Sequence, residues 1–477
     1  NRMVDAGTKK QDGITWLIEN DYIPSHLVES EIRVQKEITR SDFITVLMKV
    51  AQESLDELQI NKPNNPLTKQ MAAYYLARLL NLHMDLELEE FQDYKKVSSI
   101  CKPYVSAVTK CGIMTGETKK LWKPSMKMTW ERVGNLMKEV LAAGWFEERQ
   151  VSVISDEGFF HISDVAMDEK TKTLYVCDTY NNQIKAIKDG KITVVAGKNL
   201  GVDANGVSIG GYVDGSFEQV MFNQPTAIEV TENGLYVLDT GNNVVRFLNL
   251  ENRTSITFSG SGKVGSKNGS AKVASYNEPQ DMVLAEDGKI YIADSGNNCI
   301  RVVNKNGAVS TFAGSAGKEG YKEGTRFDAL FHYPTGLAIA DGIIYIVDCG
   351  NQRIRFIKDD IVSTYAGTGS EIDYNTNEYL GGYQDGVVKN AMFQYPKKIA
   401  IDQKGRVFIS DAGNSMIRMI ENQMVTTLAG LGFNSYVKKI AWETYLVQPE
   451  GIWFDEEENV LYVSDSLLNH IISISFK

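Results

Sequence analysis

The chain has 477 residues, 43% of them apolar, so it is long enough for two or three domains with substantial cores. It contains no run of about 18 apolar residues, and we predict no membrane-spanning helix. The net charge of −11 lies entirely in residues 151–477, which hold 29 basic and 40 acidic side chains. Nucleic acid is therefore a poor candidate partner.

Residues 1–148 are predicted to be helical. Apolar residues recur there at i, i+3, i+4 and i+7 in the segments 43–50, 72–80 and 133–141. Each segment follows a threonine that is placed as an N-cap: Thr39, Thr68 and Thr129. Three similar helix starts indicate an internal repeat.

The clearest copy of this repeat runs from Phe91 to Leu141. It begins "FQDYKK", continues through a helix to the turn "CGIMTG", and reaches its second helix at "MTWERV". The F-x-D opening, the G-I-x-x-G turn and the threonine-led second helix resemble an S-layer homology (SLH) unit. The resemblance implies an all-α bundle of three degenerate units, at roughly 13–52, 53–90 and 91–143.

SLH bundles bind acidic cell-wall polysaccharide through a basic residue that follows the capping threonine. The resemblance places Arg40 at this position in the first unit, Lys69 in the second and Trp130 in the third. Two interpretations stay open. Either Arg40 and Lys69 bind cell-wall polysaccharide, or the bundle is degenerate and only packs on its neighbour.

The cysteines show neither a CxxC pair nor a paired framework; they are Cys101, Cys111, Cys177, Cys299 and Cys349. We predict free, mostly buried thiols, which give no support for an oxidising compartment. The sequence starts at Asn1 rather than Met, so a signal peptide that has been removed would not be visible, and export must be argued from other features.

Near residue 149 the apolar spacing changes to alternation, and a motif recurs at intervals of 54 to 63 residues. That interval is the size of one small sheet. The copies are "LYVCDTYNNQIK" from Leu174, "LYVLDTGNNVVR" from Leu235, "IYIADSGNNCIR" from Ile290, "IYIVDCGNQRIR" from Ile344, "VFISDAGNSMIR" from Val407 and "LYVSDSLLNHII" from Leu461.

Each copy is predicted to be one four-stranded propeller blade. A strand opened by proline precedes the motif, as in "QPTAIEV", with Ile162 in place of proline in the first copy. A third strand and a short fourth, such as "VSTFAG", follow it, but no fourth strand follows the last copy. Val151–Ser155, "VSVIS", matches that missing strand in type, so we predict that it pairs with the last blade and closes the ring.

The proline-led strand, the "YVxDxxNxxIR" hairpin and the "G-[YS]-x-[DEN]-G" link resemble the NHL-repeat family of six-bladed β-propellers. The predicted fold is therefore a helical, SLH-like domain over residues 1–148, followed by an all-β six-bladed propeller over residues 149–477.

The repeated aspartate and the basic residue seven positions later are interpreted as structural. An aspartate at a turn accepts backbone N–H bonds, and the basic residue returns on the adjacent strand, where it can pair with the carboxylate. A binding site needs differences between blades. The basic residues are Lys185, Arg246, Arg301, Arg355 and Arg418.

Such differences occur around the proline that opens each blade, which should lie at one mouth of the central channel. The preceding position reads His161, Gln224, Glu278, Tyr333, Tyr395 and Gln448. The position two residues after the proline includes the charged residues Asp164, Asp281 and Lys398. These nine residues are the predicted ligand-binding set, although solvated loop positions are the simpler interpretation for any one of them.

The function expected from these features is ligand or partner binding by an exported bacterial cell-surface protein, with the SLH-like domain as a cell-wall anchor. The ligand would be a carbohydrate, a peptide or a protein. The alternative is an extracellular propeller hydrolase or lyase that acts on a sugar or peptide through Asp164, Asp281 and Glu278 and a bound cation. We predict no cofactor, because calcium would lack a motif and the propeller histidines occupy different registers of the repeat.

Overall fold

The computed structural model describes residues 17, 22, 37–51, 65–79, 92–99, 101–110, 114, 117–118, 121–142, 149–203, 208–369, 372–373, 378–430 and 446–476. The chain divides into two compact units, Asn1–Glu148 and Arg149–Lys477. None of the helices among the described residues is long and apolar enough to cross a membrane. Cys111 and most of the predicted "CGIMTG" turn and first SLH-like unit lie outside the described residues.

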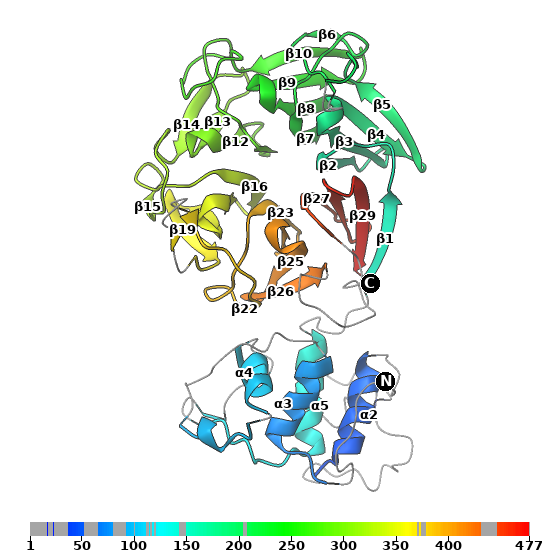
Figure 1. Cartoon of the computed structure of the whole chain (residues 1–477), viewed down its shortest axis with the longest axis vertical. Helices are drawn as coiled ribbons and strands as arrows, with labels where there is room; N and C mark the ends of the chain where they lie inside the picture. The colour runs from blue at the N-terminus through cyan, green and yellow to red at the C-terminus, as the bar shows by residue number, and fades with distance from the viewer. Residues whose placement is uncertain are drawn as a thin grey trace, which may run out of the picture. The chain divides into compact units, whose positions relative to one another are not determined.

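The described part of the first unit is helical (Figure 1). Two of the predicted N-caps are confirmed: Thr39 Oγ1 accepts the Asp42 N–H at 3.1 Å, and Thr129 Oγ1 accepts the Arg132 N–H at 3.4 Å. The cap at Thr68 is not formed. Backbone carbonyls of the 124–126 segment accept the first two N–H groups of the next helix instead. The elements are α2 (Arg40–Ala51), α3 (Lys69–Leu79), η3 (Tyr94–Lys96), α4 (Lys102–Lys110) and α5 (Trp130–Ala142).

The extended residues before α2, α3 and α5 bond to one another in a closed triangle. Ile38 N–H donates to Met128 O at 3.1 Å, Met128 N–H to Leu67 O at 2.9 Å, and Leu67 N–H to Ile38 O at 2.8 Å. All three side chains are buried. The three threonine-led helix starts therefore occupy equivalent positions around one small core.

The second unit is a ring of six antiparallel sheets (Figure 1). Blade 1 holds β2 (Ile162–Asp168), β3 (Thr173–Asp178), β4 (Gln183–Lys188) and β5 (Lys191–Ala196); blade 2 holds β7 (Pro225–Thr231), β8 (Gly234–Asp239), β9 (Val244–Asn249) and β10 (Thr254–Ser259); blade 3 holds β11 (Asp281–Leu284), β12 (Ile290–Asp294), β13 (Cys299–Val303) and β14 (Val309–Ala313).

The other three blades repeat this order. Blade 4 holds β16 (Pro334–Ala340), β17 (Ile343–Asp348), β18 (Arg353–Lys358) and β19 (Ile361–Ala366); blade 5 holds β23 (Pro396–Ile401), β24 (Val407–Asp411), β25 (Met416–Glu421) and β26 (Met424–Ala429); blade 6 holds β27 (Pro449–Asp455), β28 (Val460–Asp465), β29 (His470–Phe476) and β1 (Arg149–Ser155).

The first strand of every blade lies innermost. The six strands β2, β7, β11, β16, β23 and β27 contact one another in this order, and β27 contacts β2. Strand β1 is the outer strand of blade 6, where Val151 pairs with Ile474 of β29. The ring is therefore continuous, and both ends of this unit share one sheet.

Short pairings cover the outer edges of three blades. In blades 2, 4 and 5 the Gly-rich link adds a fifth strand, which hides hydrogen-bonding groups that the edge would otherwise expose. These strands are β6 (Gly215–Ser216), β15 (Gly324–Thr325) and β22 (Gly386–Val387). Within the link before blade 5, β20 (Ile372–Asp373) pairs with β21 (Glu378–Tyr379).

The core lies between neighbouring blades, because each sheet packs both faces against its neighbours. Strand β3 is buried along its whole length, whereas only the last residue of the outer strand β5 in the same blade is buried. One cluster of buried residues joins blades 1 and 2 through Cys177, Ile228 and Leu235. The four described cysteines are buried thiols outside any disulfide, as predicted for them.

The repeated aspartate joins several segments of each blade. In blade 3, Asp294 Oδ1 accepts the Asn277 N–H at 2.8 Å, and Asp294 Oδ2 accepts Arg301 Nη1 at 2.7 Å. Both charged side chains are fully buried, where an ion requires a partner. The predicted pairing of the aspartate with the basic residue is confirmed in blades 1 to 5; the other pairs are Asp178–Lys185, Asp239–Arg246, Asp348–Arg355 and Asp411–Arg418.

The short helical turn after each aspartate also joins neighbouring blades. After η6 (Ser295–Asn297), Asn298 adopts a left-handed conformation with φ of 54°. Its Oδ1 accepts the N–H of Tyr333, the residue before the first strand of blade 4, at 2.7 Å. The equivalent turns are η4 (Thr179–Asn181), η5 (Thr240–Asn242), η7 (Cys349–Asn351) and η8 (Ala412–Asn414). The motif therefore holds the ring together as well as the hairpin.

Candidate functional site

A polar cavity of about 310 Å³ opens where the innermost strands begin. One position of the repeat reaches it from all six blades, namely the residue directly after the opening proline or Ile162. These residues are Ser163, Thr226, Gln280, Thr335, Lys397 and Glu450. This position is not among those predicted from the sequence to bind a ligand. The available signal was that it is polar in every copy, in strands that are otherwise rich in apolar residues.

The predicted pre-proline set is divided by the structure. His161, Gln224 and Gln448, from blades 1, 2 and 6, line the cavity together. Glu278 and Tyr333 are not among its lining residues and contact each other, with Tyr333 Oη 3.5 Å from Glu278 Oε2.

Tyr395, the remaining pre-proline residue, is 45% exposed and also does not line the cavity. The split follows from side-chain direction, because the backbone is alike in five of the six copies. There the residue before the strand has a φ between 45° and 59°. A shared backbone conformation thus does not give a shared side-chain position.

An imidazole lies on the blade 1 side of the cavity. The His161 ring stacks on Tyr180, with ring centroids 4.2 Å apart and an angle of 10° between the planes. Desolvation lowers the pKa of His161; Glu450 opposes this effect and Lys397 adds to it. The neutral imidazole at neutral pH offers one hydrogen-bond donor and one acceptor.

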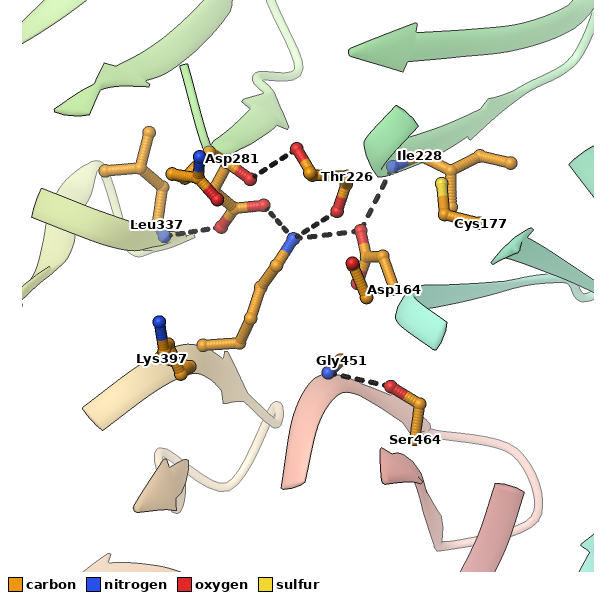
Figure 2. A network of polar contacts seen from close by, with 12 residues as sticks. Asp164, Cys177, Thr226, Ile228, Asp281, Leu337, Lys397, Gly451 and Ser464 are labelled. Carbon is orange, nitrogen blue, oxygen red and sulfur yellow. Dashed lines mark hydrogen bonds and ion pairs between the residues drawn. The ribbon is translucent and has the colours of Figure 1, made fainter. Parts of the chain in front are cut away.

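Three charged side chains fill the channel at the base of the cavity (Figure 2). Lys398 Nζ lies 3.1 Å from Asp164 Oδ2 and also bonds Asp281 Oδ1. Each carboxylate accepts one further backbone N–H, Asp164 from Ile228 at 3.0 Å and Asp281 from Leu337 at 2.7 Å. The cation comes from blade 5 and the anions come from blades 1 and 3, so the network connects blades that are not neighbours.

The charges in this network depend on one another. Burial raises the pKa of Asp164 to about 6, although Lys398 opposes the rise. Burial also raises the pKa of Asp281 against the effect of the same lysine. Burial lowers the pKa of Lys398, but the two carboxylates outweigh it and keep the value above the ordinary one. Lys398 is therefore a permanent cation at physiological pH.

The even-numbered blades leave room for this network. At the position of Asp164, blades 2, 4 and 6 carry Ala227, Gly336 and Gly451. A Cβ on Gly451 would lie 2.5 Å from Asp164 Cα, and one on Gly336 would lie 2.9 Å from Lys398 Cα. Real Cβ atoms do not approach other atoms so closely, so the innermost strands could not pack as they do with larger residues here.

Asp164 and Asp281 were predicted to bind a ligand, and in the structure each carboxylate already bonds Lys398 and a backbone N–H group. Lys398 also lines the cavity, but its ammonium bonds these two carboxylates. The sequence pattern suggested open positions because the charges from separate blades are far apart in the chain. Only the closed ring brings them together.

Glu229 of β7 is a further channel residue, and it is not among the residues predicted from the sequence. Burial raises its pKa to about 8, and the carboxylates of Asp281 and Asp164 add to the rise. The amide of Leu284 bonds its carboxyl group. Glu229 is thus largely protonated at neutral pH, and the channel holds three carboxyl groups with one ammonium.

The long insertions both attach to turns on the cavity side of the ring. Ser208, in the link before blade 2, donates its N–H to Tyr180 O at 3.3 Å. In the link before blade 5, Gly369 O accepts Arg353 Nη2 at 2.9 Å, and the Tyr379 ring lies 4.4 Å from the same guanidinium. We interpreted these insertions as connectors, and in the described residues they contact the turns of the blades that they follow.

The described residues contain no group of three or more His, Cys, Asp or Glu that could hold a metal ion. Of the three carboxylates expected for a cation-dependent enzyme, Asp164 and Asp281 meet at the Lys398 ammonium, and Glu278 contacts Tyr333 instead.

The predicted SLH-type residues lie at the starts of α2 and α3. Lys69 is buried, with Nζ 2.9 Å from Glu117 Oε1 and 4.8 Å from the centre of the Trp122 ring. Arg40 is half-buried, and Trp130 at the start of α5 is buried. Lys69 is therefore already paired with a carboxylate and an aromatic ring.

Comparison with known proteins identifies the repeat. The NHL repeat model matches residues 276–303 and 331–355. NHL repeat-containing protein 2 from Homo sapiens is 28% identical over 344 residues, which cover 65% of this chain and 46% of that protein. Protein SUPPRESSOR OF QUENCHING 1, chloroplastic, from Arabidopsis thaliana is 28% identical over 309 residues, covering 61% of this chain and 27% of that protein. The chain spans less than half the length of these relatives.

Among solved structures, an auxiliary nutrient binding protein from Bacteroides ovatus matches with a TM-score of 0.48 and 13% identity, covering 69% of this chain and 77% of that one.

The expected location is wrong. We predicted an extracellular protein at a bacterial cell surface or wall, but the relatives above that match more than 60% of this chain come from Homo sapiens and Arabidopsis thaliana, and one is named as chloroplastic. The prediction depended on the SLH resemblance, which rests on short helical patterns. The repeats themselves are settled: the chain carries NHL repeats, and they form a six-bladed β-propeller.

Proposed function

We propose that residues 149–477 form a binding module whose ligand enters the cavity at the mouth of the channel. The observation that carries this proposal is the convergence of a polar residue from every blade on one cavity. The closed ring brings equivalent positions together in any propeller, but it does not require that all six be polar, because the hairpins and the core are already held by the buried ion pairs.

The chemistry of the cavity favours a small, polar ligand. Amides of Gln224, Gln280 and Gln448 and several hydroxyl groups offer both donors and acceptors, and Tyr180 adds an aromatic ring. Carbohydrate and peptide groups present the matching partners. A cavity of about 310 Å³ is at the lower end of the range for small-molecule sites.

The geometry supports binding in preference to hydrolysis. A hydrolase of the predicted type needs two carboxyl groups that face the substrate. Here Asp164 and Asp281 are buried and bonded to Lys398, which leaves no open carboxylate pair in this network.

The test is a binding screen on the full chain with neutral sugars, uronic acids, amino acids and short peptides, measured by isothermal titration calorimetry. Any ligand of the cavity should bind at least about tenfold more weakly to Gln224→Ala and Gln448→Ala. Gln403→Ala, at the exposed turn between β23 and β24 on the other end of blade 5, is the matched control. A ligand that binds all variants equally would place the site elsewhere.

For residues 1–148 we propose that the three threonine-led helix starts are copies of one SLH-like repeat. The triangle of hydrogen bonds among Ile38, Leu67 and Met128 supports this proposal, because it gives the three copies equivalent contacts. Replacing buried Leu67 with Ser should unfold this unit at a lower denaturant concentration, while the matched change Leu121→Ser at an exposed position should not.

A further inference from the structure

The cavity presents two opposite charges that the protein itself does not neutralise. We propose that its ligand is a small zwitterion, an α-amino acid or a dipeptide, whose carboxylate bonds Lys397 and whose ammonium bonds Glu450. This inference rests on the proposed binding function of the cavity and names the class of ligand.

Lys397 supplies the cationic end. It follows Pro396 at the start of β23 and lines the cavity. Among the described residues its ammonium has no carboxylate within 4.0 Å, which separates it from its neighbour Lys398 in the channel network. A half-buried ammonium without a counter-ion is unfavourable, and a ligand carboxylate would satisfy it with charge-assisted hydrogen bonds.

Glu450 supplies the anionic end from the adjoining blade. Its side chain is only 12% exposed. Oε1 accepts Gln448 Nε2 at 2.5 Å, but Oε2 has only His161 Nε2, at 3.9 Å, which is beyond hydrogen-bond distance. Because desolvation lowers the pKa of His161, the imidazole does not neutralise this carboxylate at pH 7. One carboxylate oxygen thus remains available for a cation.

The two side chains do not pair with each other, although they occupy the same position of the repeat in blades 5 and 6. No ion pair within 4.0 Å joins them, and both line one cavity. A ligand that carries both charges a few ångströms apart would satisfy both at once. A neutral sugar would leave both charges unpaired, and an anion alone would leave Glu450 unpaired.

The rest of the wall fits such a ligand. Threonine hydroxyl groups in the wall already bond backbone carbonyls, such as Thr335 Oγ1 to Lys397 O at 2.9 Å, and these bonds make that part of the wall rigid. The amide of Gln224 and the side-chain oxygen of Gln280, whose Nε2 donates to Glu278 O at 3.4 Å, face the cavity for the peptide group or side chain of the ligand. The cavity volume of about 310 Å³ limits the ligand to one or two residues.

The experiment titrates the full chain by calorimetry with the twenty free amino acids and a set of Gly-X dipeptides. For the tightest zwitterion, the N-acetyl and the amide derivatives are then titrated. We expect each derivative to bind at least about tenfold more weakly, because each lacks one of the two charges.

Two charge-neutralising variants assign the ends of the ligand. Lys397→Gln should bind the free acid and the amide with equal affinity, and Glu450→Gln should bind the free amine and the N-acetyl compound with equal affinity. Lys404→Gln in blade 5 and Glu458→Gln in blade 6 are matched controls, because both residues are exposed in turns at the other end of their blades. Each control should keep the discrimination of the wild type.

The outcomes separate the two proposals. If a zwitterion binds Lys397→Gln and Glu450→Gln as tightly as it binds the wild type, or if its derivatives bind the wild type as tightly as the parent does, the charge assignment is overturned. If only neutral sugars bind, and Gln224→Ala weakens them, the cavity remains the site and the zwitterion is overturned. If no ligand in either screen depends on Gln224 or Gln448, the binding proposal itself fails.

Discussion

Replacing Lys398 with methionine should destabilise the propeller severely. The substitution keeps much of the side-chain volume but removes the ammonium that lies between Asp164 and Asp281. Both carboxylates are buried and would lose their only cationic partner in the network. The channel would then hold like charges without compensation, which is the least favourable arrangement for buried ions.

The size of the effect follows from the remaining contacts. Breaking a buried ion pair by removing one partner typically costs about 3–5 kcal/mol. Each carboxylate keeps one backbone donor, the N–H of Ile228 or Leu337, and burial already places the pKa of Asp164 near 6, so protonation relieves part of the loss. We therefore expect a decrease of about 3 kcal/mol in the free energy of unfolding at pH 7 and less at pH 5.

Urea unfolding of the full chain, followed by circular dichroism in the β-sheet region, measures this change. Lys404→Met, in an exposed turn of the same blade, should change the stability by no more than about 0.5 kcal/mol. The triple variant Asp164→Asn, Asp281→Asn, Lys398→Met should recover most of the loss, because no charge remains. A loss below about 1 kcal/mol in the single variant, or no recovery in the triple variant, would refute the argument.

Three further changes test other parts of the structure. Because burial raises the pKa of Glu229 from 4.5 to about 8, the folded protein binds the extra proton in this interval, and stability falls as the pH rises through it; Glu229→Gln should remove that slope in urea midpoints between pH 5 and pH 8.5. Arg301→Met should cost about 3–5 kcal/mol by leaving Asp294 unpaired, whereas Arg301→Lys should cost roughly 1–2 kcal/mol, since blade 1 uses a lysine there; equal losses would contradict the role of the ion pair. Gly451→Ala should reduce the free energy of unfolding by roughly 1–3 kcal/mol and so lower the melting temperature, because the new Cβ would meet Asp164 Cα. An unchanged melting temperature would show that the two strands can move apart without loss of stability.

The hairpin motif was predictable from the sequence because its partners are close in the chain. Asp294 and Arg301 are separated by seven residues on adjacent strands, so alternation and turn chemistry bring them together without further information. The innermost place of the proline-led strand was also predictable, and it determines which strand of each blade borders the channel.

The cavity was only partly predictable. Of the six pre-proline residues predicted to lie at the mouth, His161, Gln224 and Gln448 line the cavity. The side chains at this position have different partners: His161 stacks on Tyr180 of its own blade, whereas Glu278 contacts Tyr333 at the start of the next blade. Local spacing carries no information about that choice.

By itself, the sequence determined the number of blades, the strands that form them and the buried pairs that hold each hairpin, because periodicity and turn chemistry are local. The tertiary structure alone decided how Asp164, Asp281 and Lys398 neutralise one another and which six polar residues share a cavity. These arrangements depend on side chains of separate blades that meet on the axis of a closed ring. Their distances are set by the ring closure and not by any spacing along the chain.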